Sequence, residues 1–109
     1  MSTITIRTKR EGDKTLVRLL IDHPMETGRR RDESTGQTIP AHFITELKVE
    51  HNGKLRVRGK LTTAISRNPY FSFRLSGVKS NDLIRVTWID NLGVTDSQEI
   101  RVAAAPMGE

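Results

Sequence analysis

The feature that most constrains the fold is an alternation of apolar and polar residues with a period of two, which recurs along most of the chain. It is clearest in the segments "TITIRTK", "TLVRLLID", "FITELKVEH", "PYFSFRLSG" and "DLIRVTWID". Successive side chains of a β-strand point to opposite faces of the sheet, so this period is typical of strands that are buried on one face only. No helical period extends beyond a single turn. The pattern predicts about seven strands, two of which are Leu16–Asp22 and Phe43–Glu50.

Short turns between these segments favour antiparallel pairing. Asn52–Gly53 is a two-residue turn whose residues accept positive φ, which is a strong hairpin signal. Seven short strands with frequent turns predict a single all-β domain, residues 1–109, with an antiparallel immunoglobulin-like β-sandwich fold. The chain has no cysteine, so the core disulfide of antibody domains is absent. We therefore expect the central packing to come from Trp88, Phe71, Phe73 and Leu47.

The alternation also predicts which side chains face solvent. In the segment "FITELKVEH" we expect Phe43, Leu47 and Val49 to point inward and Ile44 to point outward. Three apolar residues fall on faces that the alternation leaves exposed, and a protein–protein interface needs such residues at its centre. We therefore predict that a partner binds through Leu20, Ile44 and Leu83.

One segment does not alternate. "HPMETGRRRDESTGQTIP" begins at His23 and separates two predicted strands. Strandless connections of this length are uncommon in compact domains and are usually functional or disordered. Pro24 biases His23 toward an extended conformation, Met25 is an adaptable apolar contact residue, and Gly28 permits a turn. We expect these residues, together with Arg29, Arg30 and Arg31, to belong to an interaction surface. Arginine prefers planar anionic partners such as carboxylates. The alternative is that the arginines pair with Glu26, Asp32 and Glu33 as a solvated loop.

The composition limits the classes of function. Without cysteine there is no thiol nucleophile, zinc–thiolate site or iron–sulfur cluster. His23, His42 and His51 match no compact metal-ligand spacing, although His23 and His42 flank the same segment and could approach each other. No nucleophile–base pair or phosphate-binding glycine loop is visible. We therefore expect no catalytic, cofactor-binding or metal-binding residues.

The net charge of +5 raises the possibility of nucleic-acid binding. However, the basic residues are dispersed among acidic ones and few aromatic residues are available to stack on bases, so a generally cationic surface that meets anionic protein partners is the preferred interpretation. The chain shows neither a signal peptide nor an apolar run of the ~18 residues that a membrane span requires. Composition and pattern taken alone indicate a cytoplasmic protein.

Three ordered motifs resemble the SoxZ family of sulfur-oxidation proteins. These are the "HPMETG" segment, the strand "AISRNPYFSFRLSG" at residues 64–77 and the hairpin "TWIDNLG". The resemblance extends from about residue 4 to residue 102. It implies an immunoglobulin-like sandwich that is not an enzyme and forms a heterodimer with SoxY, whose terminal cysteine arm carries covalent sulfur intermediates between the enzymes of thiosulfate and sulfur oxidation.

The same resemblance implies a periplasmic location, reached by export together with a signal-bearing SoxY partner, and transient contacts with other periplasmic sulfur-oxidation enzymes. It replaces the cytoplasmic interpretation. The alternatives are a basic nucleic-acid-binding sandwich, which would bind duplex DNA in a steeply salt-dependent way, and a metal-binding or redox sandwich, which would carry a metal or flavin when purified.

Overall fold

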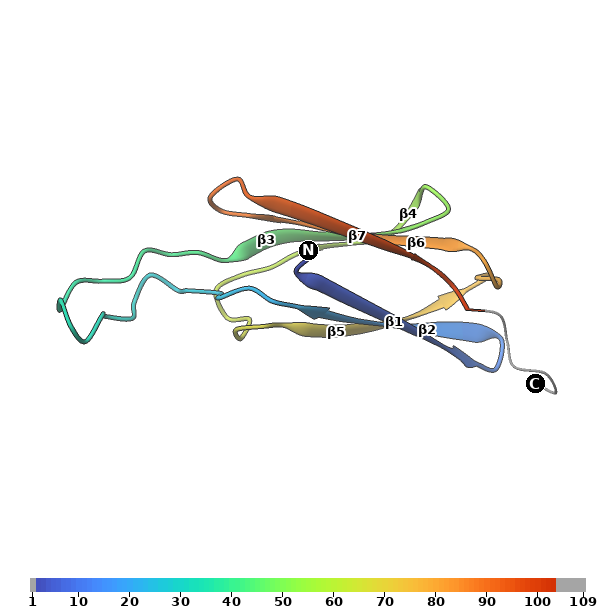
Figure 1. Ribbon diagram of the computed structural model, residues 1–109, viewed down its shortest axis with the longest axis horizontal. Helices are drawn as coiled ribbons and strands as arrows, with labels where there is room; N and C mark the ends of the chain where they lie inside the picture. Colours follow the sequence, from blue (N-terminus) through green and yellow to red (C-terminus); the bar gives the residue numbers. More distant parts are fainter. Residues whose placement is uncertain (1, 104–109) are drawn as a thin grey trace.

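The computed structural model describes residues 2–103, which form seven antiparallel β-strands in two facing sheets (Figure 1). This confirms the predicted all-β sandwich. In the described part of the chain there is no helix long and apolar enough to cross a membrane. The strands are β1 (Ile4–Glu11), β2 (Lys14–Ile21), β3 (Ile44–His51), β4 (Lys54–Lys60), β5 (Tyr70–Ser76), β6 (Leu83–Asp90) and β7 (Thr95–Arg101).

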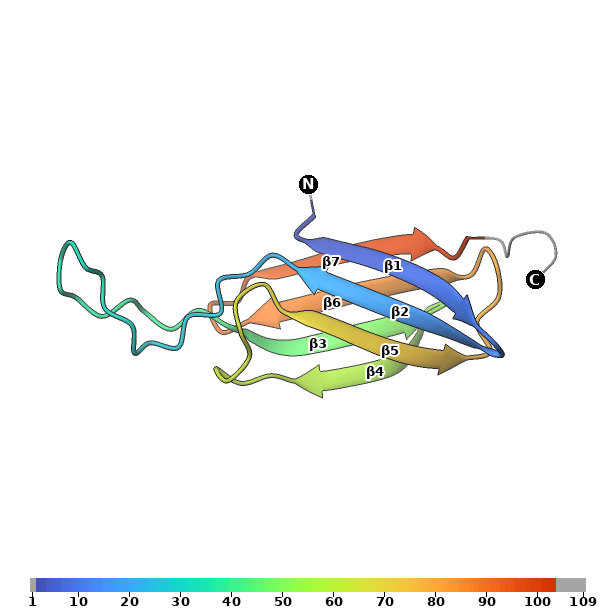
Figure 2. The ribbon, with the colours of Figure 1, turned by 90° about the horizontal axis from the view of Figure 1, so that it is seen from below.

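The two sheets have the strand orders β1-β2-β5 and β4-β3-β6-β7 (Figure 2). In the constant-type immunoglobulin arrangement the fourth strand joins the sheet of the first two strands. Here the turn at Asn52–Gly53 folds β4 back onto β3 instead. Both turn residues have positive φ, 50° and 83°, as the predicted hairpin turn requires.

The core lies between the sheets and is mainly aliphatic. Trp88 and Leu47 are buried as predicted, whereas Phe71 and Phe73 are only half-buried and stack on each other with ring centroids 6.4 Å apart. Both phenylalanines lie on β5, which is an edge strand, so no neighbouring strand covers one side of them. The large side chains that are fully buried come from the central strands: Val17, Leu19, Ile21, Ile44, Leu47, Val49, Ile84 and Val86.

The prediction that Ile44 faces solvent is wrong. Its side chain is 0% exposed, because a β-bulge at the start of β3 shifts the pairing register with β6 between Ile44 and Glu46. A bulge inserts one extra residue into a strand and reverses the alternation beyond it. Ile44 and Leu47 therefore point to the same side, into the core, although their numbers differ by three.

Residues 23–42, here called the arm, lie between β2 in one sheet and β3 in the other. The arm extends away from one end of the sandwich (Figure 1), and the molecule measures 59 × 24 × 24 Å along its principal axes. The predicted long connection between two strands is therefore confirmed, and the structure shows that it joins the two sheets. It contains no named strand, but two isolated antiparallel bridges, Glu26 with His42 and Arg31 with Thr38, pair its two halves.

Candidate functional site

The arm is a narrow hairpin held by backbone hydrogen bonds. Near the sandwich, the Glu26 and His42 amides each donate to the other residue's carbonyl, at 2.6 and 2.9 Å. At the tip, the Asp32 amide donates to the Gln37 carbonyl at 2.8 Å, and the Asp32 carboxylate accepts from the backbone amide of Ser34 at 2.8 Å. Hydrogen bonds to the Asp32 carboxylate from the hydroxyl and the amide of Ser34 and from the amide of Thr35 lower its pKa, as expected when the ionised form is the acceptor. The arm therefore has a defined backbone path although it lies outside both sheets.

The three arginines of the arm differ in their partners. The side chain of Arg30 is paired with Glu26, with Nε 3.2 Å from Oε2, and this hydrogen bond is the main cause of the lowered pKa of Glu26. Among the residues that the structure describes, neither Arg29 nor Arg31 forms an ion pair, and both are exposed. The alternative of a fully paired loop therefore holds for Arg30 only, and Arg29 and Arg31 remain available to an anionic group.

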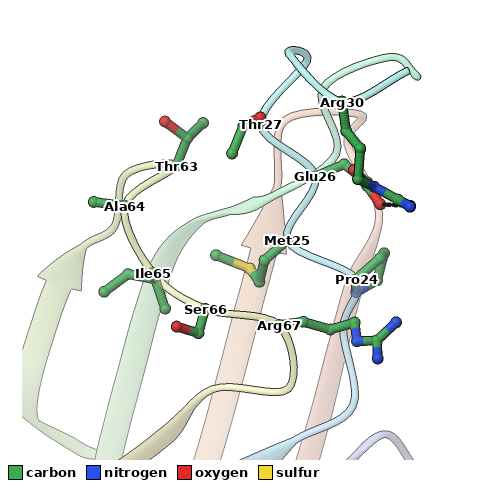
Figure 3. A pocket seen from close by; sticks show the side chains of 10 residues that line it. All are labelled: Pro24, Met25, Glu26, Thr27, Arg30, Thr63, Ala64, Ile65, Ser66 and Arg67. Atoms are coloured by element: carbon green, nitrogen blue, oxygen red, sulfur yellow. Dashed lines mark hydrogen bonds and ion pairs between the residues drawn. The ribbon is translucent and has the colours of Figure 1, made fainter. Parts of the chain in front are cut away.

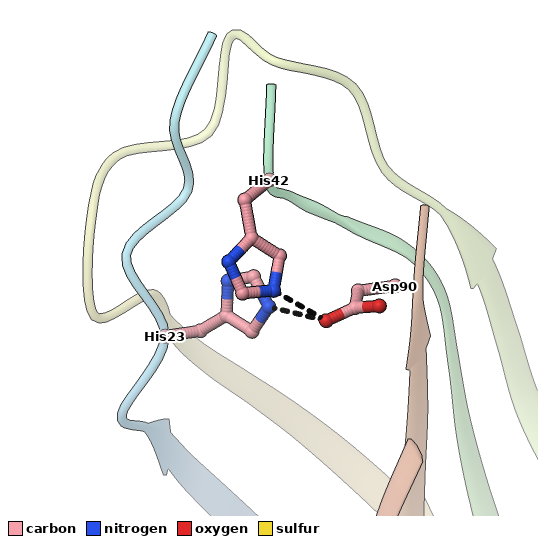
Figure 4. Close-up of side chains that lie close together, drawn as sticks. All are labelled: His23, His42 and Asp90. Atoms are coloured by element: carbon pink, nitrogen blue, oxygen red, sulfur yellow. Dashed lines mark hydrogen bonds and ion pairs between the residues drawn. The ribbon is translucent and has the colours of Figure 1, made fainter. Parts of the chain in front are cut away.

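The base of the arm is fixed by the carboxylate of Asp90, at the end of β6 (Figure 4). Its Oδ2 atom lies 3.1 Å from Nε2 of His23, where the arm begins, and 2.7 Å from Nε2 of His42, where it ends. Its Oδ1 atom accepts the backbone amides of Leu92 and Val94 in the β6–β7 turn, at 3.0 and 2.9 Å. One buried carboxylate therefore joins both ends of the arm to the sandwich.

Asp90 is ionised in this setting. Burial alone would raise its pKa, but hydrogen bonds from both histidines and from the two turn amides outweigh burial, so the pKa lies below its usual value. The sequence contained a signal for this residue that the site prediction missed. Ile84, Val86 and Trp88 point inward, and the same alternation places Asp90 on the buried face. A carboxylate at a buried strand end requires donors, and two histidines flank the adjoining segment.

The proximity of His23, His42 and Asp90, whose ligand atoms lie within 4.8 Å of one another, raises the question of a metal site. The second nitrogen of His23 argues against one. Its Nδ1 accepts the backbone amide of Met25 at 3.2 Å, so in the neutral ring the proton is on Nε2, the atom that faces Asp90. A metal-bound histidine usually donates from its second nitrogen, which is the reverse arrangement. The geometry fits a hydrogen-bonded clamp better than a metal site.

Two predicted contact residues are not exposed. His23 is 2% exposed, and Met25 is 5% exposed and belongs to the core. The expectation that Met25 offers a free apolar contact is therefore wrong in this structure: it has the left-handed φ of 52°, which turns its side chain inward, where its sulfur accepts the Ile44 amide at 3.3 Å. Pro24 is exposed at the surface, and Gly28 has a φ of 86° and packs closely against Ala41.

A groove of about 490 Å³ lies between the base of the arm and the connection from β4 to β5 (Figure 3). Its lining is partly apolar, from Pro24, Met25 and Ile65, and partly basic, from Arg30 and Arg67. The Glu26 carboxylate also lines the groove, where Arg30 and Arg67 both favour its ionised form. The groove extends the arm's surface toward the sandwich and combines apolar contact with opposite charges.

The predicted interface residues do not lie together. Leu20 is 49% exposed on the outer face of the three-stranded sheet, near the arm. Leu83 is half-buried at the start of β6, on the outer face of the four-stranded sheet and at the other end of the sandwich. Because Ile44 is in the core, no single flat interface can be centred on all three residues.

The third histidine is remote from the arm. His51 lies at the opposite end of the sandwich, where its Nε2 is 2.8 Å from Oδ2 of Asp82. This hydrogen bond, with others from the Lys79 amide and Asn52, lowers the pKa of Asp82 to about 2. His51 and Asp82 thus form a second Asp–His pair, but this pair is partly exposed and stabilises a turn, not the arm.

Comparison with known proteins agrees with this architecture. The model of the family described as "Sulphur oxidation protein SoxZ" matches residues 4–101, which cover all seven strands and the arm. No curated protein matches the chain. The match includes all three motifs on which the resemblance was based. The chain therefore belongs to the SoxZ family, as a non-catalytic sulfur-oxidation protein with an immunoglobulin-like fold that partners SoxY in the carrier complex of the periplasmic Sox system.

Proposed function

We propose that this chain supports SoxY in the carrier complex and uses its arm as a docking surface for the enzymes that process the carried sulfur group. The observation that carries the proposal is the clamped arm itself. Its two ends are fixed by one buried carboxylate, while exposed Arg29 and Arg31 lie far outside the sandwich. A docking surface beside a mobile carrier group must be held at a constant position. The clamp at the base of the arm holds the arm in this way.

The charges of the arm favour short-range recognition. Its three arginines are balanced by Glu26, Asp32 and Glu33, so the arm has no net charge. However, Arg30 and Glu26 neutralise each other, and Asp32 is occupied by the tip turn. Among the described residues, the guanidinium groups of Arg29 and Arg31 form no ion pair and are exposed. They fit carboxylates on an enzyme, or an anionic sulfur group, through paired hydrogen bonds.

We expect replacement of Arg29, Arg30 and Arg31 by serine to slow association of the loaded carrier complex with its processing enzymes. The expected decrease is about three- to tenfold at low salt and smaller at physiological salt, because salt screens exposed charges. Stopped-flow association measured separately for each enzyme, at both salt concentrations, provides the test. Formation of the heterodimer with SoxY should be unchanged.

A matched control removes the same charge from the other end of the sandwich. Replacing Lys54, Lys79 and Arg101 by serine lowers the net charge equally but leaves the arm intact. This variant should associate at nearly the parent rate. If both triple variants slow association alike, net charge is the cause and the arm has no docking role; if neither does, the arginines only maintain solubility.

We also propose that the chain reaches the periplasm bound to SoxY. The SoxY partnership and the periplasmic location of the Sox system support this. When both proteins are co-expressed, deleting the SoxY signal should keep this chain in the cytoplasm. Cell fractionation tests this, and periplasmic recovery of the chain without exported SoxY would contradict the proposal.

A further inference from the structure

The two outer faces of the sandwich differ in how their charged side chains are paired. On the four-stranded sheet, acids and bases lie opposite each other across neighbouring strands: Glu46 faces Lys60 and Arg85 faces both Glu50 and Glu99. Glu46 also pairs with Arg58, with Oε1 3.2 Å from Nε. Opposite charges on paired strands stabilise a sheet. Lys48 faces Arg58 on this sheet, but both bases contact the same carboxylate, with Nζ of Lys48 3.6 Å from Oε1 of Glu46, so most of the charge on this face has an opposite charge beside it.

The outer face of the three-stranded sheet concentrates positive charge. Its cross-strand rows read Arg7–Arg18–Ser72 and Lys9–Leu16–Arg74, with Arg7 directly opposite Arg18. Arg74 pairs with Glu11 at 2.9 Å, and Glu11 also faces Lys14 across the strands; among the described residues no ion pair involves Arg7, Lys9 or Arg18. Like charges directly opposite each other destabilise a sheet. The arrangement thus works against the stability of the isolated chain.

Arg18 at the centre of this face is incompletely paired. Its Nε atom is buried, yet within the described residues it makes no hydrogen bond. Buried polar groups are nearly always hydrogen-bonded, so this exception is unusual; because Nε is already covered in the free chain, an acceptor on a partner reaches it only if the side chain moves. A carboxylate is the acceptor that fits the guanidinium fork best.

The adjacent row supplies an apolar anchor. Leu20 is paired with Tyr70 across β2 and β5, and the two side chains are 49% and 58% exposed. Leu16, two residues from Arg18 along the same face, is half-buried. Tyrosine and arginine are the residue types most enriched at the energetic centres of interfaces. Apolar side chains beside arginines that lack an ion-pair partner are typical of a stable protein–protein interface.

We propose that SoxY packs on the outer face of the three-stranded sheet, through a surface that places an apolar patch on Leu20 and Tyr70 and carboxylates on Arg7 and Arg18. The arm then stays free at the end of the sandwich. The inference rests on the SoxY partnership and not on the docking role of the arm, which involves other residues and other proteins.

The test compares two double variants. Replacing Arg7 and Arg18 by serine should raise the dissociation constant of the heterodimer at least tenfold and reduce its salt dependence. Replacing Lys48 and Arg85 by serine, at the equivalent central rows of the other face, should change it less than twofold. Titration of fluorescently labelled SoxY at two salt concentrations measures both. Leu20→Ser tests the apolar anchor and should also raise the dissociation constant.

A second measurement separates binding from folding. The Arg7 and Arg18 double variant should melt at the parent temperature or above it, because it removes a like-charge pair. Weaker heterodimer formation by a chain that is no less stable is a result that general unfolding cannot produce. An unchanged dissociation constant, or an equal effect of the Lys48 and Arg85 variant, would overturn the proposal. The proposal would also be wrong if the Arg7 and Arg18 double variant lost binding to duplex DNA but still bound SoxY, because the face would then bind nucleic acid.

Discussion

Replacing Ile44 by aspartate is expected to leave no folded protein, whereas replacing the exposed Leu20 by aspartate is expected to leave the sandwich intact. Ile44 is 0% exposed and lies at the first position of β3. Truncating a buried isoleucine costs about 2–5 kcal/mol, and placing an unpaired carboxylate in its position adds several more. A domain of this size is stable by only about 5–15 kcal/mol. Far-UV circular dichroism and thermal melting of the isolated chain test both variants.

The conservative variant Ile44→Val controls for the position. It removes one methylene and should cost about 1 kcal/mol while the protein remains folded. If Ile44→Asp instead folds and melts like the parent chain, then β3 has no bulge and Ile44 faces solvent, as simple alternation predicts. The interface that was predicted to include Ile44 would then be open to test again.

Ile44 shows why alternation alone does not predict every inward-facing residue. Alternation correctly predicted the inward faces of β2 and β6, because neither strand contains the extra residue of a bulge. It failed at Ile44 because a bulge changes the phase of the pattern, and no glycine or proline marks the bulge in "FITEL". The number of strands and the hairpin at Asn52–Gly53 depend on local chemistry and were predicted. Which residues of a bulged strand face inward depends on the strand that it pairs with, and that strand is distant in the sequence.

The candidate site was only partly predictable for a related reason. The arm was visible as a long segment without alternation, and the approach of His23 and His42 could be anticipated because they flank it. That Asp90 joins them depends on β3 and β6 being neighbours, which is a property of the topology. The same holds for Leu20 and Leu83, whose placement on opposite outer faces follows only from the division of strands between the two sheets. Residue types indicated the chemistry, but the sheet order determines which residues meet.

Asp90→Ala is expected to lower the free energy of unfolding by about 3 kcal/mol or more and to release the base of the arm. The carboxylate has no exposed side-chain surface and accepts from two imidazoles and two backbone amides. Its removal leaves four donors without an acceptor, of which the one on His23 is fully buried and the other three are partly buried, and each buried unsatisfied group costs about 1–3 kcal/mol. Chemical denaturation measures the loss. Hydrogen exchange should show faster exchange at the amides of Met25, Leu92 and Val94.

Asp82→Ala provides the matched control, since Asp82 also accepts from a histidine and a backbone amide but is partly exposed. Water can replace its contacts, so the expected loss is only about 1 kcal/mol. An equal loss at both positions would mean that Asp90 is no more than an ordinary turn residue.

The pH dependence of Asp90→Asn gives an independent measure of the same clamp. The pKa of Asp90 is lower in the folded chain than its usual value, so the folded state favours the ionised form. The stabilisation is therefore complete above the unfolded pKa of about 3.9 and is lost as the pH falls through the folded pKa. The difference in unfolding free energy between the parent and Asp90→Asn should thus shrink as the pH falls below about 4, through the pKa of Asp90 in the folded chain. A difference that persists unchanged below both pKa values would show that the ionised carboxylate is not what holds His23 and His42 in place, and that the shape of the side chain alone fixes the arm.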